Sequence, residues 1–183
     1  FDAVPDKSIK KSDNPYFRYE ISADVTDING ETRSASSSIS AGYTALQIKI
    51  NGQNSYDKEL AGKIGISTEN FNGKKINSVV TIKISKLKDS SNKEISEFKT
   101  PSFNKEKELF TQTFDTSKNS ELTLDFSAYP LGKYVVEAET KDKFGEKVKA
   151  SSEFTLYSSK STEVPYKTTN WFFVPKSSAE PND

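Results

Sequence analysis

Oxygen-bearing side chains gather in one short stretch of the chain, and they are Asp24, Asp27, Asn29 and Glu31. Carboxylate and amide oxygens at this spacing are ligands that a calcium ion takes in proteins. An EF-hand loop, however, needs an acid two residues before Asp27 and a glutamate seven residues after Asn29. Val25 and Ser36 occupy those positions. We therefore interpret the stretch as a plain turn and predict no metal site.

Residues suited to catalysis are scarce. The chain has no cysteine and no histidine, which excludes thiol nucleophiles, Cys/His zinc sites and His-based triads from this segment. The serines lack a Gly-x-Ser-x-Gly elbow. Neighbouring carboxylates such as Glu137 and Glu139 alternate with apolar residues, so we expect them on the solvent face of a strand. We predict that the segment is not an enzyme and binds no cofactor.

An aromatic run near the C-terminus could form a platform for sugars, and it comprises Trp171, Phe172 and Phe173, with Tyr166 nearby. Carbohydrate modules usually present such rings on rigid faces. A buried strand or an interdomain contact is therefore the interpretation we favour. Trp171 to Val174 has the pattern of the first strand of a following domain, flanked by Pro175.

The charge and the hydrophobic pattern of the chain argue against two classes of partner. Lys plus Arg is 26 and Asp plus Glu is 26, so no basic footprint for nucleic acid is present overall. The lysine runs are interspersed with acids and are interpreted as solvated surface; they are Lys7, Lys10 and Lys11, and Lys105 and Lys107. No apolar run approaches the roughly 20 residues of a membrane helix. We expect neither nucleic-acid binding nor membrane insertion by this segment.

One segment of the sequence occurs twice. Tyr19 to Glu31 recurs as Tyr134 to Glu146, 115 residues later, which is about the length of one small β domain. Phe144 stands where the first copy has Asn29, and a ligand set would not tolerate that change. The pattern is typical of the same closing hairpin in two consecutive domains of a tandem array. We expect a segment of a longer protein, in which the first copy closes a domain whose other strands are missing.

Alternating hydrophobicity predicts strands, and no stretch has a convincing helical period; Asn104 to Phe110 is the only short candidate. Residues 89–108 read as a long polar connection. Tyr134 is expected to be a corner tyrosine, whose ring packs in the core while its hydroxyl bonds to nearby backbone. We predict an all-β fold of tandem immunoglobulin- or fibronectin III-like sandwiches. Its parts are a lead or linker (1–15), the closing hairpin and exit strand of a truncated domain (16–50), a linker (51–59), a complete sandwich (60–157), and a linker with the first strand of a following domain (158–183).

The first hairpin also carries a family motif, Tyr19-x-Ile21-x-Ala23-x-Val25-Thr26-Asp27-x-Asn29-Gly30-Glu31-Thr32. It resembles bacterial α2-macroglobulin-like proteins, especially those of Bacteroidetes type, whose macroglobulin domains often close with a hairpin reading Ala-x-Val-Thr-Asp-x-x-Gly. The second hairpin, from Gly132 to Gly145, fits the pattern more loosely. The tail from Trp171 to Asp183 is similar to the start of a following domain, and the stretch from Lys99 to Phe103 also resembles those proteins.

The resemblance implies a large exported protein, periplasmic or at the cell surface, that traps proteases by collapsing its domains when a bait segment is cleaved. Many such proteins carry a Cys-x-Glu-Gln thioester, which this cysteine-free segment cannot contain. The segment would then be a non-catalytic structural scaffold, made of macroglobulin domains of an endopeptidase inhibitor. Its partners would be neighbouring domains of the same chain, and it would meet proteases only through the full-length protein. The alternative is a generic immunoglobulin-like interaction module of a bacterial surface adhesin or a glycan-handling protein.

The apolar face of the first hairpin also predicts a contact. Because it belongs over a sheet that is missing here, we expect it to dock either on the complete sandwich or on a second copy of the chain. The second case would give a weak homodimer through exposed strand edges.

Overall fold

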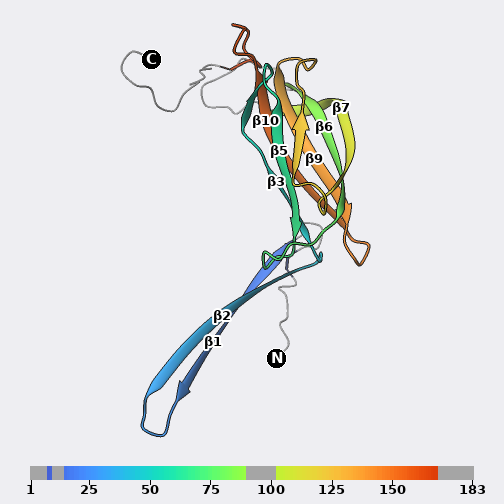
Figure 1. The fold of residues 1–183 in the computed structure, drawn as a ribbon. Helices are drawn as coiled ribbons and strands as arrows, with labels where there is room; N and C mark the ends of the chain where they lie inside the picture. The colour runs from blue at the N-terminus through green and yellow to red at the C-terminus, as the bar shows by residue number, and fades with distance from the viewer. Residues whose placement is uncertain (1–7, 10–14, 90–101, 169–183) are drawn as a thin grey trace, which may run out of the picture.

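The computed structural model describes residues 8–9, 15–89 and 102–168 (Figure 1). This part of the chain contains strands, turns and loops but no helix, and so no helix that could cross a membrane. Its strands are β1 (Tyr16–Thr26), β2 (Thr32–Gly42), β3 (Gln47–Asn51), β4 (Ser55–Asp57), β5 (Gly62–Glu69), β6 (Val79–Asp89), β7 (Phe103–Asp115), β8 (Glu121–Leu124), β9 (Gly132–Lys141) and β10 (Lys147–Tyr157).

Strands β3 to β10 form two sheets that enclose one core. The larger sheet has the order β4-β10-β9-β6-β7 and the smaller sheet has the order β3-β5-β8. All neighbours are antiparallel except β4 and β10, which run parallel. In β6, Val80, Ile82 and Ile84 are completely buried, and the residues between them point outward. The alternation in the sequence therefore marks the inner face of a sandwich, and the predicted all-β fold is confirmed.

Aromatic rings fill one end of this core. The ring of Tyr134 stacks on Phe154 with centroids 5.2 Å apart, and Phe126 lies 5.5 Å from Phe154. The Tyr134 hydroxyl donates a hydrogen bond to the carbonyl oxygen of Pro130 at 2.5 Å. A buried phenol needs such a partner for its polar end. The packing and the backbone bond predicted for Tyr134 are thus confirmed.

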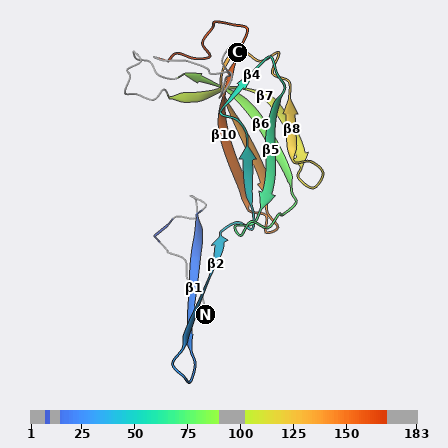
Figure 2. The same cartoon turned by 60° about the vertical axis from the view of Figure 1, so that its left-hand side comes forward.

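The β1–β2 hairpin is a separate two-stranded sheet that extends away from one end of the sandwich (Figures 1 and 2). Most of its side chains are exposed on both faces, including Ile21 (56%), Val25 (68%) and Ile39 (53%). The sequence prediction allowed the apolar face to dock on the sandwich, and in this structure it does not. Within the described part of the chain, no second layer covers this long ribbon.

Among the described residues, the contacts between the hairpin and the sandwich lie at the base of the hairpin. The ring of Phe71, in the turn between β5 and β6, stacks on Tyr16 with centroids 5.8 Å apart. The side-chain amide of Asn72 accepts the backbone N–H of Ser40 at 2.8 Å and donates to the Ser40 carbonyl at 3.1 Å. These contacts are few, so the joint between the two parts is small.

The structure corrects two boundaries expected from the sequence. Strand β3 was expected to leave the hairpin domain, but it pairs with β5, and Leu46 and Ile48 lie in the sandwich core. Strand β4, expected in a linker over 51–59, pairs with β10. The first part of β7 falls within the expected polar connection and includes the short helix candidate, yet it pairs with β6. The aromatic run at 171–173 and the lysines at 7, 10 and 11 lie outside the described residues.

Candidate functional site

The stretch considered for calcium forms the turn of the β1–β2 hairpin. The backbone N–H groups of Asn29 and Glu31 donate to one carboxylate oxygen of Asp27, at 2.8 and 2.9 Å. Gly30 closes the turn at a φ of 86°, a conformation that favours glycine. Asp24 accepts a serine hydroxyl from the opposite strand at 2.5 Å. These carboxylates hold the hairpin together, and nowhere in the described ranges do three or more His, Cys, Asp or Glu gather to hold a metal.

Asp142 makes the same turn between β9 and β10. The N–H groups of Phe144 and Glu146 donate to its Oδ1, both at 2.9 Å, and Gly145 has a φ of 84°. The second oxygen of Asp142 has a further role, since it accepts the N–H of Ala45 at 2.8 Å. Ala45 lies in the segment that leads from the hairpin into β3. Asp142 thus fixes where the chain enters the sandwich.

The surroundings of Asp142 keep its carboxylate charged. The side chain is only 6% exposed, and burial by itself raises the pKa of a carboxyl group. The backbone donors, Ala45 and Phe144 foremost, outweigh that effect and hold the pKa of Asp142 below its ordinary value. A carboxylate stabilised in this way is a structural anchor and not a proton donor.

The turn between β5 and β6 has this geometry too, with asparagine in place of aspartate. The N–H groups of Asn72 and Lys74 donate to the Asn70 side-chain oxygen at 3.0 and 2.9 Å, and Gly73 has a φ of 81°. The likeness of this turn to the other two was missed in the sequence. The spacing Asn70-x-Asn72-Gly73, beside Asp27-x-Asn29-Gly30, carried that signal.

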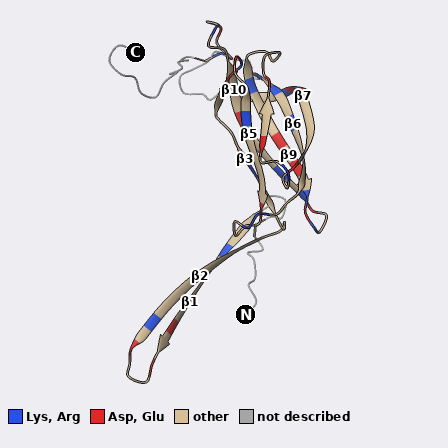
Figure 3. Ribbon diagram, in the orientation of Figure 1, with Lys and Arg blue, Asp and Glu red and all other residues tan. Residues whose placement is uncertain are grey.

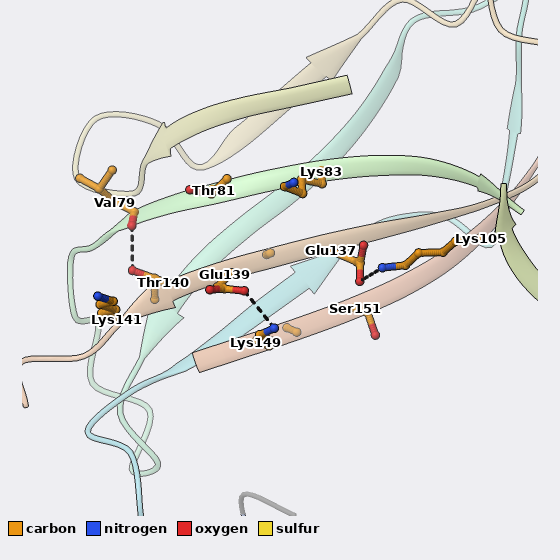
Figure 4. Close-up of a pocket in the computed structure, with 12 residues that line it drawn as sticks. Val79, Thr81, Lys83, Lys105, Glu137, Glu139, Thr140, Lys141, Lys149 and Ser151 are labelled. Carbon is orange, nitrogen blue, oxygen red and sulfur yellow. Dashed lines mark hydrogen bonds and ion pairs between the residues drawn. The ribbon is translucent and has the colours of Figure 1, made fainter. Parts of the chain in front are cut away.

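An open depression of about 840 Å³ lies on the outer face of β6, β9 and β10 (Figure 4). Ion pairs cross it: the Lys105 ammonium lies 2.5 Å from Glu137, and the Lys149 ammonium lies 3.1 Å from Glu139. Figure 3 shows segments with lysine or arginine and segments with aspartate or glutamate on neighbouring strands of the sandwich. The residues that line the depression are Val79, Thr81, Lys83, Lys105, Glu137, Ala138, Glu139, Thr140, Lys141, Lys149, Ala150 and Ser151.

The electrostatics of this depression do not suit acid catalysis. The hydrogen bond from Lys149 lowers the pKa of Glu139, and the bond to Glu108 raises the pKa of Lys83. Both shifts favour the charged forms at neutral pH, whereas a general acid needs a raised carboxyl pKa. Glu137 and Glu139 lie on the outward face, as the alternation predicts. The depression is an ion-paired strand surface, and cross-strand pairs of this kind are not visible in a single strand's sequence.

Tyr166 belongs to a small aromatic cluster. Its ring meets Phe103 edge to face at 5.6 Å, and the Lys133 ammonium lies 5.2 Å from the Phe103 centroid and 5.7 Å from that of Tyr166. The residue proposed to flank a sugar platform therefore packs against β7 and β9. This contact ties the segment after β10 to the side of the larger sheet.

No family model and no curated protein matches the chain. Solved structures of two variants of superoxide reductase (neelaredoxin) from Ignicoccus hospitalis are similar to it. One has 11% identity, a TM-score of 0.36, and a match covering 63% of this chain and 83% of that chain. The other has 12% identity, a TM-score of 0.35, and a match covering 62% and 82%. At these TM-scores the likeness carries no argument about function.

Proposed function

We propose that the chain is a non-catalytic scaffold segment of a large exported α2-macroglobulin-like protein that traps proteases. The observation that carries this proposal is the repeated hairpin. Its first copy bears the family motif, and both copies build the same aspartate-centred turn. Two copies of one closing hairpin, a domain length apart, are expected where sandwich domains follow one another in tandem.

We also propose that the sandwich is of the immunoglobulin or fibronectin III type. In such folds the strands named C, F and G lie in one sheet, and the strands named A, B and E lie in the other. Here β6, β9 and β10 are neighbours in the larger sheet, and β3, β5 and β8 form the smaller one. The bond from Tyr134 to Pro130 supports this assignment, because a corner tyrosine is expected near the start of the F strand, which β9 would be.

The joint between hairpin and sandwich suits a protein whose domains move as units. It includes the Tyr16–Phe71 ring stack, the Asn72–Ser40 pair and the Ala45–Asp142 bond. Small and partly polar interfaces between domains permit relative motion. A trap that closes after a cleavage needs such joints between rigid modules.

The test is to read the gene on both sides of the segment and express its full product. The account expects an export signal, further repeats of this kind and a bait segment, with or without a Cys-x-Glu-Gln motif. After incubation with trypsin, the full product should hold the protease so that it cleaves a small chromogenic peptide but not casein. The isolated chain should inhibit nothing.

A short reading frame that ends in an anchoring or glycan-binding module would reject the trap. It would support the alternative, an interaction module of a surface adhesin or a glycan-handling protein. A full-length product that leaves casein cleavage unchanged would also reject the trap, even if tandem repeats are present.

A further inference from the structure

The two hairpins pair their strands in one and the same register. Tyr134 lies opposite Phe154 in β9–β10, and the residues 115 positions earlier, Tyr19 and Ile39, lie opposite each other in β1–β2. All ten residue pairs of β9–β10 have such a counterpart in β1–β2. A slip of one residue would turn every side chain to the other face, so this agreement fixes which face of β1–β2 corresponds to the sandwich interior.

The matching faces carry matching side chains. The corresponding pairs are Tyr19 and Tyr134, Ile21 and Val136, Ala23 and Ala138, Ala35 and Ala150, Ser37 and Ser152, and Ile39 and Phe154. In β9–β10 the apolar members Tyr134, Val136 and Phe154 are buried under the smaller sheet. In β1–β2 the same face is exposed, except that Tyr19 is half-buried. The face has the composition of a sandwich interior, but no described strand forms a layer over it.

The edges and the corner of the hairpin repeat the sandwich as well. Pro15 precedes Tyr19 by the spacing that separates Pro130 from Tyr134. In the sandwich, β6 pairs along β9, and the N–H of Thr155 in β10 donates to a carbonyl just before β4 at 2.9 Å. In the hairpin, the edge of β1 has no strand beside it among the described residues, and the Asn72 side chain takes the position beside β2.

We propose that β1–β2 is the docking surface for the remaining strands of a second sandwich of this same kind. The partner presents a three-stranded sheet like β3–β5–β8 over the face of Tyr19, Ile21 and Ile39. A β6-like strand with alternating aliphatic residues pairs antiparallel with β1 at residues 18–24, the positions that match the pairing of β6 with β9. This inference rests on the scaffold role proposed above, but it needs no protease.

Two residues beside the turn depart from the match. Val25 stands in the place of the buried Thr140 and keeps the face apolar. Arg33 occupies the place of Val148, whose side chain is buried in the sandwich. The position lies next to the turn, at the rim of the sheet, where a long arginine can cover apolar surface and keep its charge in water. Arg33 is the one charged side chain that β1 and β2 contribute to the matched face between residues 19 and 39.

The test is a hairpin graft within the full chain. Residues 133–155 are replaced by residues 18–40, which keeps Gly132 and the buried Leu156 in place. The matched control places residues 19–41 in the same position and so turns the polar face inward. Circular dichroism during heating should show one cooperative transition for the in-register graft and none for the shifted graft. Equally cooperative unfolding of the two grafts would overturn the proposal.

Two further measurements cover a graft that fails to fold and a second copy of the chain as the occupant. If the in-register graft fails to fold, the same graft with Arg33→Val removes the only charge on the inner face, and its failure overturns the proposal. Sedimentation of the unaltered chain tests a second copy as the occupant. A dimer that forms at micromolar concentration and is lost with Ile21→Asp but not with Ser22→Asp would assign the face to that copy and overturn the proposal. A successful graft beside a failed trypsin assay would reject only the protease trap.

Discussion

The hairpins β1–β2 and β9–β10 share a turn, a register and a face, yet their surroundings are opposite. Both turns are closed by an aspartate that accepts hydrogen bonds from two backbone N–H groups, and the strands of both hairpins pair in the same register. One hairpin lies in the sheet of a sandwich, and the other extends into solvent. The comparison separates what the local sequence determines, the turn and register, from what only a second layer supplies, the stability of the face.

The largest expected difference concerns the equivalent tyrosines. Tyr134→Ala empties a fully buried ring site and removes the bond to Pro130, so it should lower the free energy of unfolding by about 4 kcal/mol. Tyr19→Ala removes a half-buried ring from a ribbon that no described strand covers, and it should change the free energy of unfolding by less than about 0.5 kcal/mol. Urea unfolding followed by circular dichroism measures both. Similar losses would mean that β1–β2 is part of the same cooperative unit.

The equivalent aspartates should differ next. Asp142→Ala removes three bonds to backbone N–H groups at a buried site, and we expect a loss of about 3 kcal/mol. Asp27→Ala removes two bonds at an exposed turn and should change the unfolding of the sandwich by less than about 0.5 kcal/mol. The same urea titrations give both values. A large effect of Asp27→Ala would contradict the separation of the two parts.

Acid should expose the same contrast. Because the folded state lowers the pKa of Asp142, its contribution to stability is complete above the unfolded-state value of about 4 and is lost as the pH falls through the folded-state value. The free energy of unfolding should therefore drop below about pH 4, and Asp142→Asn should make that drop shallower. Unfolding midpoints measured from pH 6 to pH 2.5 test this. An unchanged slope in Asp142→Asn would remove Asp142 as the cause.

The smallest effect is expected at the joint. Asn72→Ala breaks the two bonds to Ser40 at an exposed position, which should cost less than about 1 kcal/mol while loosening the hairpin's orientation. The chain has no cysteine, so spin labels can be placed at Ile28→Cys and Ser127→Cys without interference. The distance distribution between them should broaden in Asn72→Ala. Lys74→Ala, at the end of the same turn, is the control and should leave the distribution unchanged.

Much of the sandwich could be predicted from alternation, because a strand with one buried face records that face in every second residue. β6 and β9 illustrate this, with apolar residues inward and lysines or glutamates outward. Alternation does not say which sheet a strand joins, so β3 was assigned to the wrong side of a boundary. The first part of β7 is exposed on both faces and gives no such signal.

The candidate sites were harder to predict because their contacts are distant in sequence. Asp142 and Ala45 are 97 residues apart, and the pair of Lys105 with Glu137 joins two strands that are not neighbours in the sheet. The turns could be recognised because all their bonds fall within five residues. The repeat predicted that the sheet belonging over β1–β2 is missing here, but an apolar face in the sequence does not say whether the sandwich takes its place.

Native-state hydrogen exchange of the backbone amides tests the central claim most directly. In the unaltered chain at low concentration, the paired amides of β9 at residues 134–140 should exchange only through global unfolding, with protection corresponding to about 5 kcal/mol or more. The equivalent amides of β1 at residues 19–25 should exchange through local opening, at least a hundredfold faster. Equal protection of the two sets would show that β1–β2 already has a second layer and would contradict the account.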